Sequence, residues 1–340
     1  MIRYRQFAIW ALAVLTLAPL AAAQTYHITD LGTFPGGTVS QGDAINLRGE
    51  VAGYARFANY NAHGFEWKQG GKLQNLSPIA PGSDFAVAEA INAVGQVAGY
   101  STYNPEDAGE HAVLWVRGSL ADLGTLPGGT LSQAMGINDA GEVTGFSDGG
   151  ESEPHAFLWN KTQGMQDLGT LPGGYYSQGL GINNKGQVVG YSNDAKGNWH
   201  GFVWSKSAGI VALAAPPNTG VNQSANAIND LGQIAGGSAF PTGNFAALWT
   251  PDNTIESLGA LPGQGWSSAF AINNLGQVVG WSGYLAFFWS STTGMLDLNT
   301  LIPPNSGWIL TAAFGINGRG QITGEGDING QTHAFVLTPD

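Results

Sequence analysis

One turn recurs seven times along this chain of 340 residues, at intervals of 44 to 46 residues. Each copy has an Ile-Asn pair, then a glycine three residues after the asparagine, then Gln or Glu, then Val or Ile. The asparagines are Asn46, Asn92, Asn138, Asn183, Asn229, Asn273 and Asn317. A fixed period of this length indicates a repeat architecture in which each copy is one supersecondary unit.

Each repeat contains four short segments bounded by Gly, Pro, Asn or Ser. In one unit they span residues 131–138, 141–147, 155–159 and 165–169. The third segment alternates large side chains on one face, as at His155, Phe157 and Trp159, which is the period of a β-strand. Four strands repeated seven times predict an all-β, seven-bladed β-propeller with antiparallel blades, in one domain over residues 24–340.

Small residues recur at fixed strand positions. A glycine lies inside the second strand of every copy, as at Gly145, and the first strand has only Gly or Ala two and four positions before each asparagine, as at Ala134 and Gly136. Glycine weakens a strand, so its recurrence implies a steric need. We expect neighbouring sheets to approach closely at these positions.

The ends of the repeat predict how the ring closes. The chain begins with a fourth-strand segment, residues 26–31, and ends after a third strand, residues 333–337. We expect these two segments to pair, so that the last blade is completed by the first strand. An open solenoid is the alternative, but it would show atypical capping repeats.

The first 23 residues have the plan of a secretory signal peptide: Arg3 and Arg5, an apolar run over residues 7–20, and small residues ending at Ala23. We expect cleavage after Ala23 and an exported protein, extracellular or periplasmic, with no membrane segment after cleavage. Cleavage would change the formal net charge from -12 to -14, because both arginines are lost.

This acidic charge argues against nucleic acid as a partner. The chain has no cysteine, so its core must hold by packing without disulfides. No phosphate loop, metal motif or other cofactor signature is found, and we expect a monomer without a cofactor.

Two motifs recur in register. One begins the third strand, and the other, Asp-Leu-Gly-Thr-Leu-Pro-Gly-Gly, follows in the fourth strand and the crossover. The first reads His155-Ala156-Phe157 and His333-Ala334-Phe335, with close variants at His63-Gly64-Phe65 and His200-Gly201-Phe202. The combination resembles the bacterial HAF repeat family, a probable extracellular repeat, although Phe245 and Leu285 stand where His is expected. The resemblance implies export and a repeat fold, and no particular activity.

Two patterns resemble a metal site and a catalytic nucleophile, but we expect both to be structural. Histidines at the start of successive third strands lie about 10 Å or more apart, too far to share a metal ion, so we expect each to bond backbone and to pack beside Trp. The G-x-S-x-G pattern at residues 145–149 lacks the strand-turn-helix context of a nucleophile elbow.

The loops between the second and third strands vary most between copies, and we expect them to share one face with the proline-glycine crossovers. That loop-rich face would gather Glu106, Asp107, Glu110, Asp148, Glu151, Glu153, Asp194, Glu325 and Asp327, with Tyr103 and the candidate binding residues Tyr175, Tyr176, Trp199, Trp266 and Trp308. Aromatic rings beside carboxylates suit sugars. The alternative is that the acids are solvated and the aromatics pack the crossovers.

Inside the ring, the position three before each asparagine reads Asp43, Glu89, Met135, Leu180, Asn226, Phe270 and Phe314. Asp43 and Glu89 are carboxylates on adjacent inner strands. They are candidates for ligand binding, or for acid-base work if burial separates their pKa values, or they simply line a wetted channel.

Two functions therefore stay open. The first is a secreted non-catalytic propeller that binds a polysaccharide or protein at its loop-rich face. The second is a secreted carbohydrate-active enzyme, a hydrolase or lyase, that uses Asp43 and Glu89 or acids of the rim. Propellers host both kinds of protein, so the fold does not choose between them.

Overall fold

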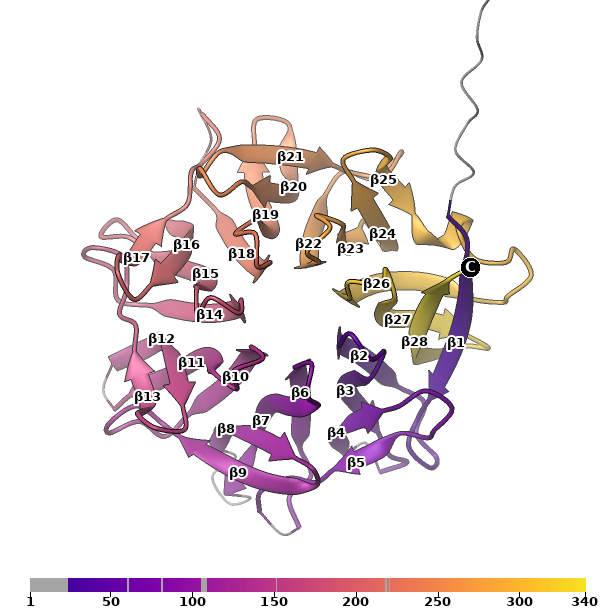
Figure 1. The fold of residues 1–340 in the computed structure, drawn as a ribbon, viewed down its shortest axis with the longest axis horizontal. Coiled ribbons are helices and arrows are strands. Elements are labelled where there is room, and N and C mark those ends of the chain that lie inside the picture. Colours follow the sequence, from indigo (N-terminus) through magenta and orange to yellow (C-terminus); the bar gives the residue numbers. More distant parts are fainter. Residues whose placement is uncertain are drawn as a thin grey trace, which may run out of the picture.

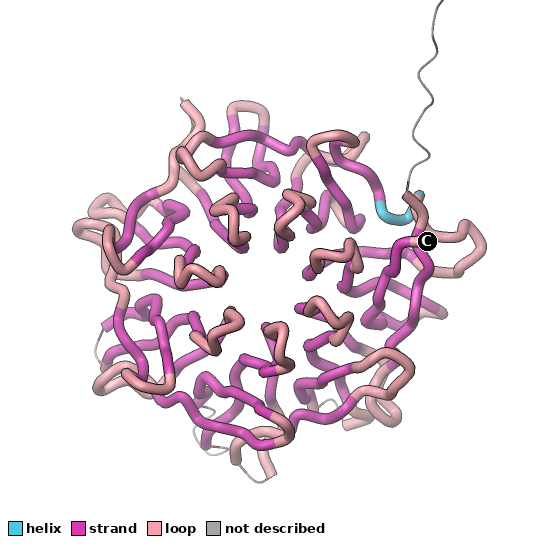
Figure 2. The backbone as a smooth tube through the Cα atoms, in the orientation of Figure 1, coloured by secondary structure: helices cyan, strands magenta, loops and turns pink. Residues whose placement is uncertain are grey.

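A computed structural model describes residues 24–59, 61–80, 82–104, 109–150, 152–217, 219 and 221–340. These residues form seven four-stranded antiparallel sheets, arranged as blades around a central axis (Figure 1). The one helical element among them is a short 3-10 turn, η1 (Leu298–Thr300), so the ring is built from strands and loops (Figure 2). The predicted seven-bladed β-propeller is confirmed, whereas the predicted signal peptide lies outside the described residues.

Every blade has the same order of strands from the axis outward. The innermost strands are β2 (Ser40–Ile45), β6 (Ala86–Ile91), β10 (Ser132–Ile137), β14 (Ser177–Ile182), β18 (Gln223–Ile228), β22 (Ser267–Ile272) and β26 (Ile309–Ile316). The second strands are β3 (Val51–Arg56), β7 (Gln96–Asn104), β11 (Val143–Gly149), β15 (Val188–Asn193), β19 (Ile234–Phe240), β23 (Val278–Ser282) and β27 (Ile322–Ile328). The third strands are β4 (Ala62–Trp67), β8 (Gly109–Val116), β12 (Ser152–Asn160), β16 (Trp199–Ser205), β20 (Gly243–Trp249), β24 (Leu285–Ser290) and β28 (Gln331–Pro339). The outer strands are β5 (Gln74–Leu76), β9 (Ser119–Gly124), β13 (Gly164–Asp167), β17 (Gly209–Ala212), β21 (Ile255–Gly259), β25 (Gly294–Asp297) and β1 (Tyr26–Gly32).

The Ile-Asn turns join the innermost strand of each blade to the second strand. In the third blade, Asn138 Oδ1 accepts hydrogen bonds from the backbone N–H of Ala140 and Glu142, at 3.1 and 2.9 Å. Gly141 closes the turn with a φ of 79°, a conformation in which glycine is favoured. The predicted role of the asparagine and the glycine within the turn is confirmed.

The same asparagines also connect the blades, which the sequence analysis did not predict. Each asparagine donates from Nδ2 to the backbone carbonyl of the asparagine in the next blade, over 2.8 to 3.2 Å. All seven asparagines are buried. The result is a closed ring of seven hydrogen bonds around the axis, which we call the asparagine ring.

The recurring glycine of the second strand has a different cause from the one expected. A Cβ on Gly145 would come much closer than 3.0 Å to the backbone carbonyl of Gln133, on the innermost strand of the same blade. The register of β10 against β11 shifts just beside this contact, between Ala134 and Gly136. The prediction of a close approach between sheets is therefore wrong for these glycines, because a bulge within the blade excludes the Cβ.

On the innermost strands the predicted close approach between sheets is confirmed. A Cβ on Gly42 would clash with Thr323 Oγ1 of the preceding blade, and a Cβ on Gly179 with Thr144 Oγ1. Farther from the axis, each junction between consecutive blades holds its own apolar cluster. Phe157, for example, is fully buried in the cluster between the second and third blades. The core is thus a ring of seven junctions.

The first and last strands close the ring as predicted. Strand β1 pairs antiparallel with β28, from Tyr26 opposite Pro339 to Asp30 opposite Phe335. Tyr26 is almost completely buried, and its backbone N–H donates to the carbonyl of Leu301 at 2.9 Å. Figure 1 shows β1 as the outer strand of the last blade, so the end blade has no unpaired third strand.

The crossovers and the loops between second and third strands meet on one face, as predicted. Backbone N–H groups of Thr130 and Leu131 in a crossover both donate to Asp148 Oδ1, at 2.8 Å. Leu126 N–H donates to Ser147 Oγ at 2.9 Å. The opposite face carries the Ile-Asn turns, so the two faces of the ring differ in both length and variability of their loops.

Candidate functional site

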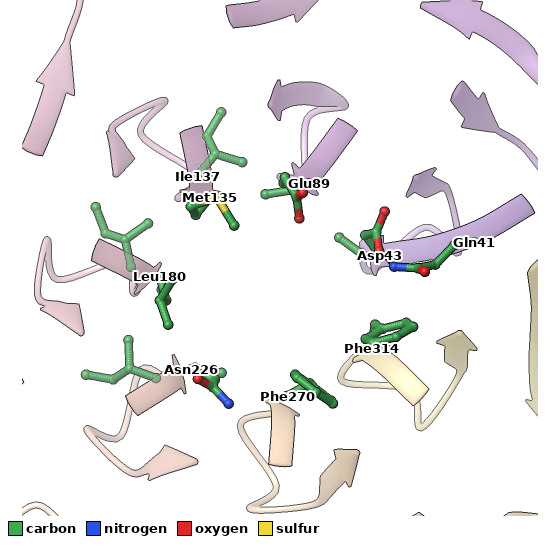
Figure 3. A pocket seen from close by; sticks show the side chains of 16 residues that line it. Gln41, Asp43, Glu89, Met135, Ile137, Leu180, Asn226, Phe270 and Phe314 are labelled. Carbon is green, nitrogen blue, oxygen red and sulfur yellow. Dashed lines mark hydrogen bonds between the residues drawn. The ribbon is translucent and has the colours of Figure 1, made fainter. Parts of the chain in front are cut away.

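The residues three positions before the asparagines line one central cavity. It has a volume of about 440 Å³, and its wall includes all seven of them: Asp43, Glu89, Met135, Leu180, Asn226, Phe270 and Phe314. Figure 3 shows these side chains pointing toward the axis from the seven innermost strands. The alternation of a strand places this position inward, so the column read from the sequence is the lining of the cavity.

Asp43 and Glu89 form the acidic side of the central cavity. Asp43 Oδ1 accepts a hydrogen bond from Gln41 Nε2 at 2.6 Å, while Asp43 Oδ2 is buried and has no hydrogen-bond partner among the described residues. Burial, and then the neighbouring charge of Glu89, raise the pKa of Asp43 well above its usual range. Burial raises the pKa of Glu89 to about 7. Burial thus favours the protonated form of both carboxyls.

The other side of the central cavity is apolar. Phe270 and Phe314 lie with ring centroids 5.2 Å apart and planes inclined at 56°, and Met135 and Leu180 continue the wall. Of the described residues that line the cavity, none is Lys or Arg. The cavity thus offers carboxylates on one side and apolar surface on the other.

A second cavity lies on the loop-rich face, where three candidate residues meet. Tyr175, Tyr176 and Trp199 line it together with Tyr191, Glu153, Asn222, Gln223 and Ser224, and it has a volume of about 650 Å³. We call it the rim cavity. Tyr191 was not among the sequence candidates.

Local hydrogen bonds and ring contacts position the aromatic walls of the rim cavity. Asn193 Oδ1 accepts from the backbone N–H of Tyr175 and Tyr176, at 3.0 and 2.9 Å, and so fixes the crossover against the second strand. The Trp199 ring meets Tyr176 edge to face at 5.3 Å and Tyr191 at 5.6 Å. Burial raises the pKa of Tyr191 well above its ordinary value of 10, so its hydroxyl stays protonated and donates to Gln178 Oε1 at 2.7 Å.

The four aromatic residues that line the rim cavity differ in their exposure to solvent. Tyr175 is 58% exposed, whereas Tyr176, Tyr191 and Trp199 are partly buried. In a cavity lined by exposed and partly buried rings, a flat ligand can stack on one ring and contact the others at its edge.

The remaining two aromatic candidates do not join this group. Trp266 packs edge to face on Trp281 at 3.7 Å and on Tyr284 at 5.9 Å. Trp308 packs against His333 and Phe335 of the last blade. Trp266 and Trp308 therefore do not line the rim cavity, because they belong to other blades.

The acids of the loop-rich face hold loops together. Asp148 caps a crossover, Asp194 accepts from the backbone N–H of Lys196 and Asn198, and Asp327 accepts from Thr332 Oγ1 at 3.0 Å. Glu110 accepts from Gln133 Nε2. These acids bond groups of the protein itself, whereas the alternative expected them to be solvated; Glu106, Asp107 and Glu151 lie outside the described residues.

Three of the five repeated histidines pair with carboxylates of the outer strand, whereas His63 bonds Asn75 and His200 bonds Asp194 of a loop. His155 Nδ1 lies 3.0 Å from Asp167 Oδ2, and His111 and His333 pair in the same way with Asp122 and Asp30. The expected bond to backbone is wrong, because the aspartate of Asp-Leu-Gly lies opposite the histidine. This contact explains why the two motifs recur in register. The hydrogen bond to Asp167 raises the pKa of His155 above its ordinary value.

The G-x-S-x-G pattern is part of the blade framework. Ser147 is fully buried in β11, and its Oγ donates to the carbonyl of Leu131 at 2.9 Å. Such a hydroxyl is closed to a substrate. The described residues also contain no group of three or more His, Asp or Glu side chains that is arranged to hold a metal ion.

The opposite mouth of the ring is formed by the asparagine ring. The turns enclose a hollow of about 370 Å³, lined by the asparagines and by Asp139, Asn184, Asp230 and Asn274. These side chains bond one another or neighbouring backbone, as in the 2.9 Å bond from Asn184 N–H to Asp230 Oδ1. The polar side chains that line this hollow are therefore largely bonded to one another or to the backbone.

Comparison with known proteins identifies the fold and no family. No family model matches the chain, and no curated protein matches it. The resemblance to the HAF repeat family stays a prediction. Among solved structures, virginiamycin B lyase from Staphylococcus aureus aligns with a TM-score of 0.55 and 14% identity, over 93% of this chain and 99% of that protein.

Two further structures share the architecture over part of their length. A puromycin-hydrolysing peptidase from Mycobacterium tuberculosis aligns with a TM-score of 0.58 and 13% identity, over 89% of this chain and 52% of the peptidase. TolB from Acinetobacter baumannii aligns with a TM-score of 0.47 and 11% identity, over 86% of this chain and 63% of TolB. The chain thus spans less than two thirds of either protein. In the described part of the chain no helix is long and apolar enough to cross a membrane. The likeness to the lyase and to the peptidase supports the β-propeller fold and no particular activity.

Proposed function

We propose that this protein is an exported, non-catalytic propeller that binds a polysaccharide at its loop-rich face. The observation that carries the proposal is the rim cavity, which is lined by an exposed Tyr175 and by Trp199, Tyr176 and Tyr191. Sugar rings present C–H faces that stack on such aromatic surfaces, and Glu153, Asn222 and Gln223 supply groups for hydroxyls. The signal-peptide pattern at residues 1–23 supports export.

The rim cavity also has the properties of a preformed site. Asn193 holds the backbone of both crossover tyrosines, and Trp199 is bordered by two rings. Little side-chain entropy is then lost when a ligand binds.

The first experiment is a glycan array probed with residues 24–340, followed by calorimetric titration of a ligand that the array selects. Tyr175→Ala and Trp199→Ala should each weaken binding roughly tenfold or more, since stacking contributes on the order of 1–3 kcal/mol. Tyr103→Ala is the matched control, because Tyr103, near the end of β7, is also an exposed aromatic but stacks on His111 in another blade. Binding that is lost equally in the control, or an array without any ligand, would reject the proposal.

A second candidate function, a secreted carbohydrate-active enzyme, is favoured by one observation. Glu89, with a pKa of about 7, can donate or accept a proton at neutral pH, and Asp43 shares its cavity. If the protein cleaves the polysaccharide, Glu89→Gln should abolish product formation and leave binding in place. Intact polymer after long incubation with the unmodified protein would reject this candidate.

A further inference from the structure

The central cavity contains two carboxyls and no positively charged residue among the described residues that line it. Asp43 Oδ2 is buried in the wall without a hydrogen-bond partner among the described residues, and Glu89 stands on the adjacent strand. A buried carboxylate oxygen without a donor costs free energy, because it has given up its hydration. The protein can offset this cost by protonation or by binding a cation.

The shape and lining of the cavity indicate which kind of cation fits. The carboxyls occupy one side, and Phe270, Phe314, Met135 and Leu180 occupy the other (Figure 3). A metal ion prefers several oxygen ligands around it. Across from the carboxyls, the described side chains of the lining offer one oxygen, Asn226 Oδ1, and it already accepts a hydrogen bond from Ser224 Oγ. An organic ammonium group matches both sides, because its N–H groups donate to the carboxylates while its carbon skeleton contacts the apolar wall.

The central cavity adjoins the rim cavity. Ser224 lines the rim cavity, and its hydroxyl hydrogen-bonds with Asn226, which lines the central cavity. On the same border, Tyr191 of the rim cavity donates to Gln178, two residues before Leu180 of the central cavity. One extended ligand can therefore contact both.

We propose that the central cavity binds a primary ammonium group, so that the saccharide recognised by this protein carries free amines. This inference rests on the proposed function, because the rim cavity supplies the stacking surface for the sugar rings. An oligosaccharide with free amines meets both requirements. One sugar ring can stack on Tyr175 and Trp199, while an ammonium group farther along the oligosaccharide pairs with Asp43 and Glu89, which lie across the central cavity from Asn226 (Figure 3). The high pKa values of both carboxyls are consistent with a site that lacks its cation.

The test compares oligosaccharides that differ only in the amine. Residues 24–340 are titrated calorimetrically, at about 0.15 M salt, with a β-1,4-linked glucosamine hexamer and with its N-acetylated counterpart. The free amine should bind roughly tenfold or more tightly, because a charge-assisted hydrogen bond in a buried site is worth about that factor. The double variant Asp43→Asn/Glu89→Gln should bind both hexamers with equal affinity.

Two controls separate this inference from weaker explanations. Asp252→Asn/Glu256→Gln removes two exposed acids on or beside β21, and should leave the preference for the amine unchanged if the preference is local. The Asp43/Glu89 variant loses carboxyls that are costly to ionise, so it should fold at least as stably as the unmodified protein.

The outcomes distinguish the inference from the function on which it rests. If the acetylated hexamer binds equally well, or if the Asp43/Glu89 variant keeps the preference, the ammonium site is wrong while saccharide binding stands. A preference that is also lost in the β21 control would equally overturn it, because it would then reflect the overall charge. If no saccharide binds at all, the proposed function itself is wrong.

Discussion

Asn317 in the last blade donates a hydrogen bond from Nδ2 to the backbone carbonyl of Asn46 in the first blade, over 2.8 Å and across 271 positions of sequence. This bond completes the asparagine ring, in which each asparagine side chain bonds its own turn and also the turn of the next blade. Asn317 Oδ1 also accepts from the N–H groups of Arg319 and Gln321. One side chain thus satisfies four polar partners when the 2.9 Å bond to Gln321 Oε1 is included.

Asn317→Ala should lower the free energy of unfolding by about 2–3 kcal/mol, because it leaves buried backbone groups without partners. Urea denaturation followed by tryptophan fluorescence measures the change. The control is Arg319→Ala, which removes an exposed side chain of the same turn and should cost less than about 1 kcal/mol. Equal losses in both variants would show that the ring adds nothing to the turns themselves.

Removal of the closing strand should destabilise the whole ring. A chain that begins at Thr33 loses β1, with its buried Tyr26 and Leu31, and exposes the edge of β28. We expect a lower urea midpoint and a tendency to associate through the open edge. A chain that begins at Thr25 is the reference, and equal stability of the two would refute closure by β1.

Gly280→Ala should be among the most damaging single changes, because the new Cβ would meet the backbone carbonyl of Ser268 within the same blade. The backbone must shift, and we expect a loss of at least about 3 kcal/mol or insoluble protein. Gly265→Ala lies close to the same blade, where a Cβ meets nothing within 4 Å and φ is not positive, so it should be neutral. Thermal unfolding of both variants measures the contrast, and a stable Gly280→Ala protein would refute the bulge as the cause.

The stability of the protein should respond to pH through Glu89. The folded protein holds a proton on Glu89 up to a pKa of about 7, whereas the ordinary value is 4.5. The folded state therefore binds more protons between these values, so this group lowers stability as the pH rises from about 4.5 to 7. The titratable and charged groups that share its surroundings are Asp43, Tyr54, Arg56, Tyr100, Glu110 and Glu325.

Glu89→Gln removes this titration, and it also removes the charge that contributes to the raised pKa of Asp43. The stability advantage of the variant over the unmodified protein should grow by about 1–3 kcal/mol between pH 4.5 and pH 8. Urea denaturation at a series of pH values measures the difference. A difference that is constant with pH would contradict a raised pKa at Glu89.

The blades and their closure were predictable from sequence because both follow from periodicity. A turn with Asn and Gly at fixed spacing identifies itself locally, and a spare outer strand such as residues 26–31 has one place to pair. The asparagine ring was not predictable, because a bond from Asn317 to Asn46 depends on how blades stack. The pairing of His155 with Asp167 was within reach, since the two motifs recur in register.

The candidate site was predicted in part. The column of Asp43 and Glu89 marked the central cavity, because alternate strand residues share a face. The lining of the rim cavity was predicted only in part: the sequence analysis named Tyr175, Tyr176 and Trp199 but not Tyr191. A signal existed: the residue after each second-strand glycine varies widely, as Tyr54, Tyr100, Phe146, Tyr191, Gly237, Trp281 and Glu325.

The most direct test of the central claim is a crystal structure of residues 24–340 with an oligosaccharide that the array selects. We predict sugar density in the rim cavity, with a ring face against Tyr175 or Trp199 and polar contacts to Glu153 or Gln223. Density at the asparagine-ring mouth or on an outer blade surface, with an empty rim cavity, would contradict the proposed function.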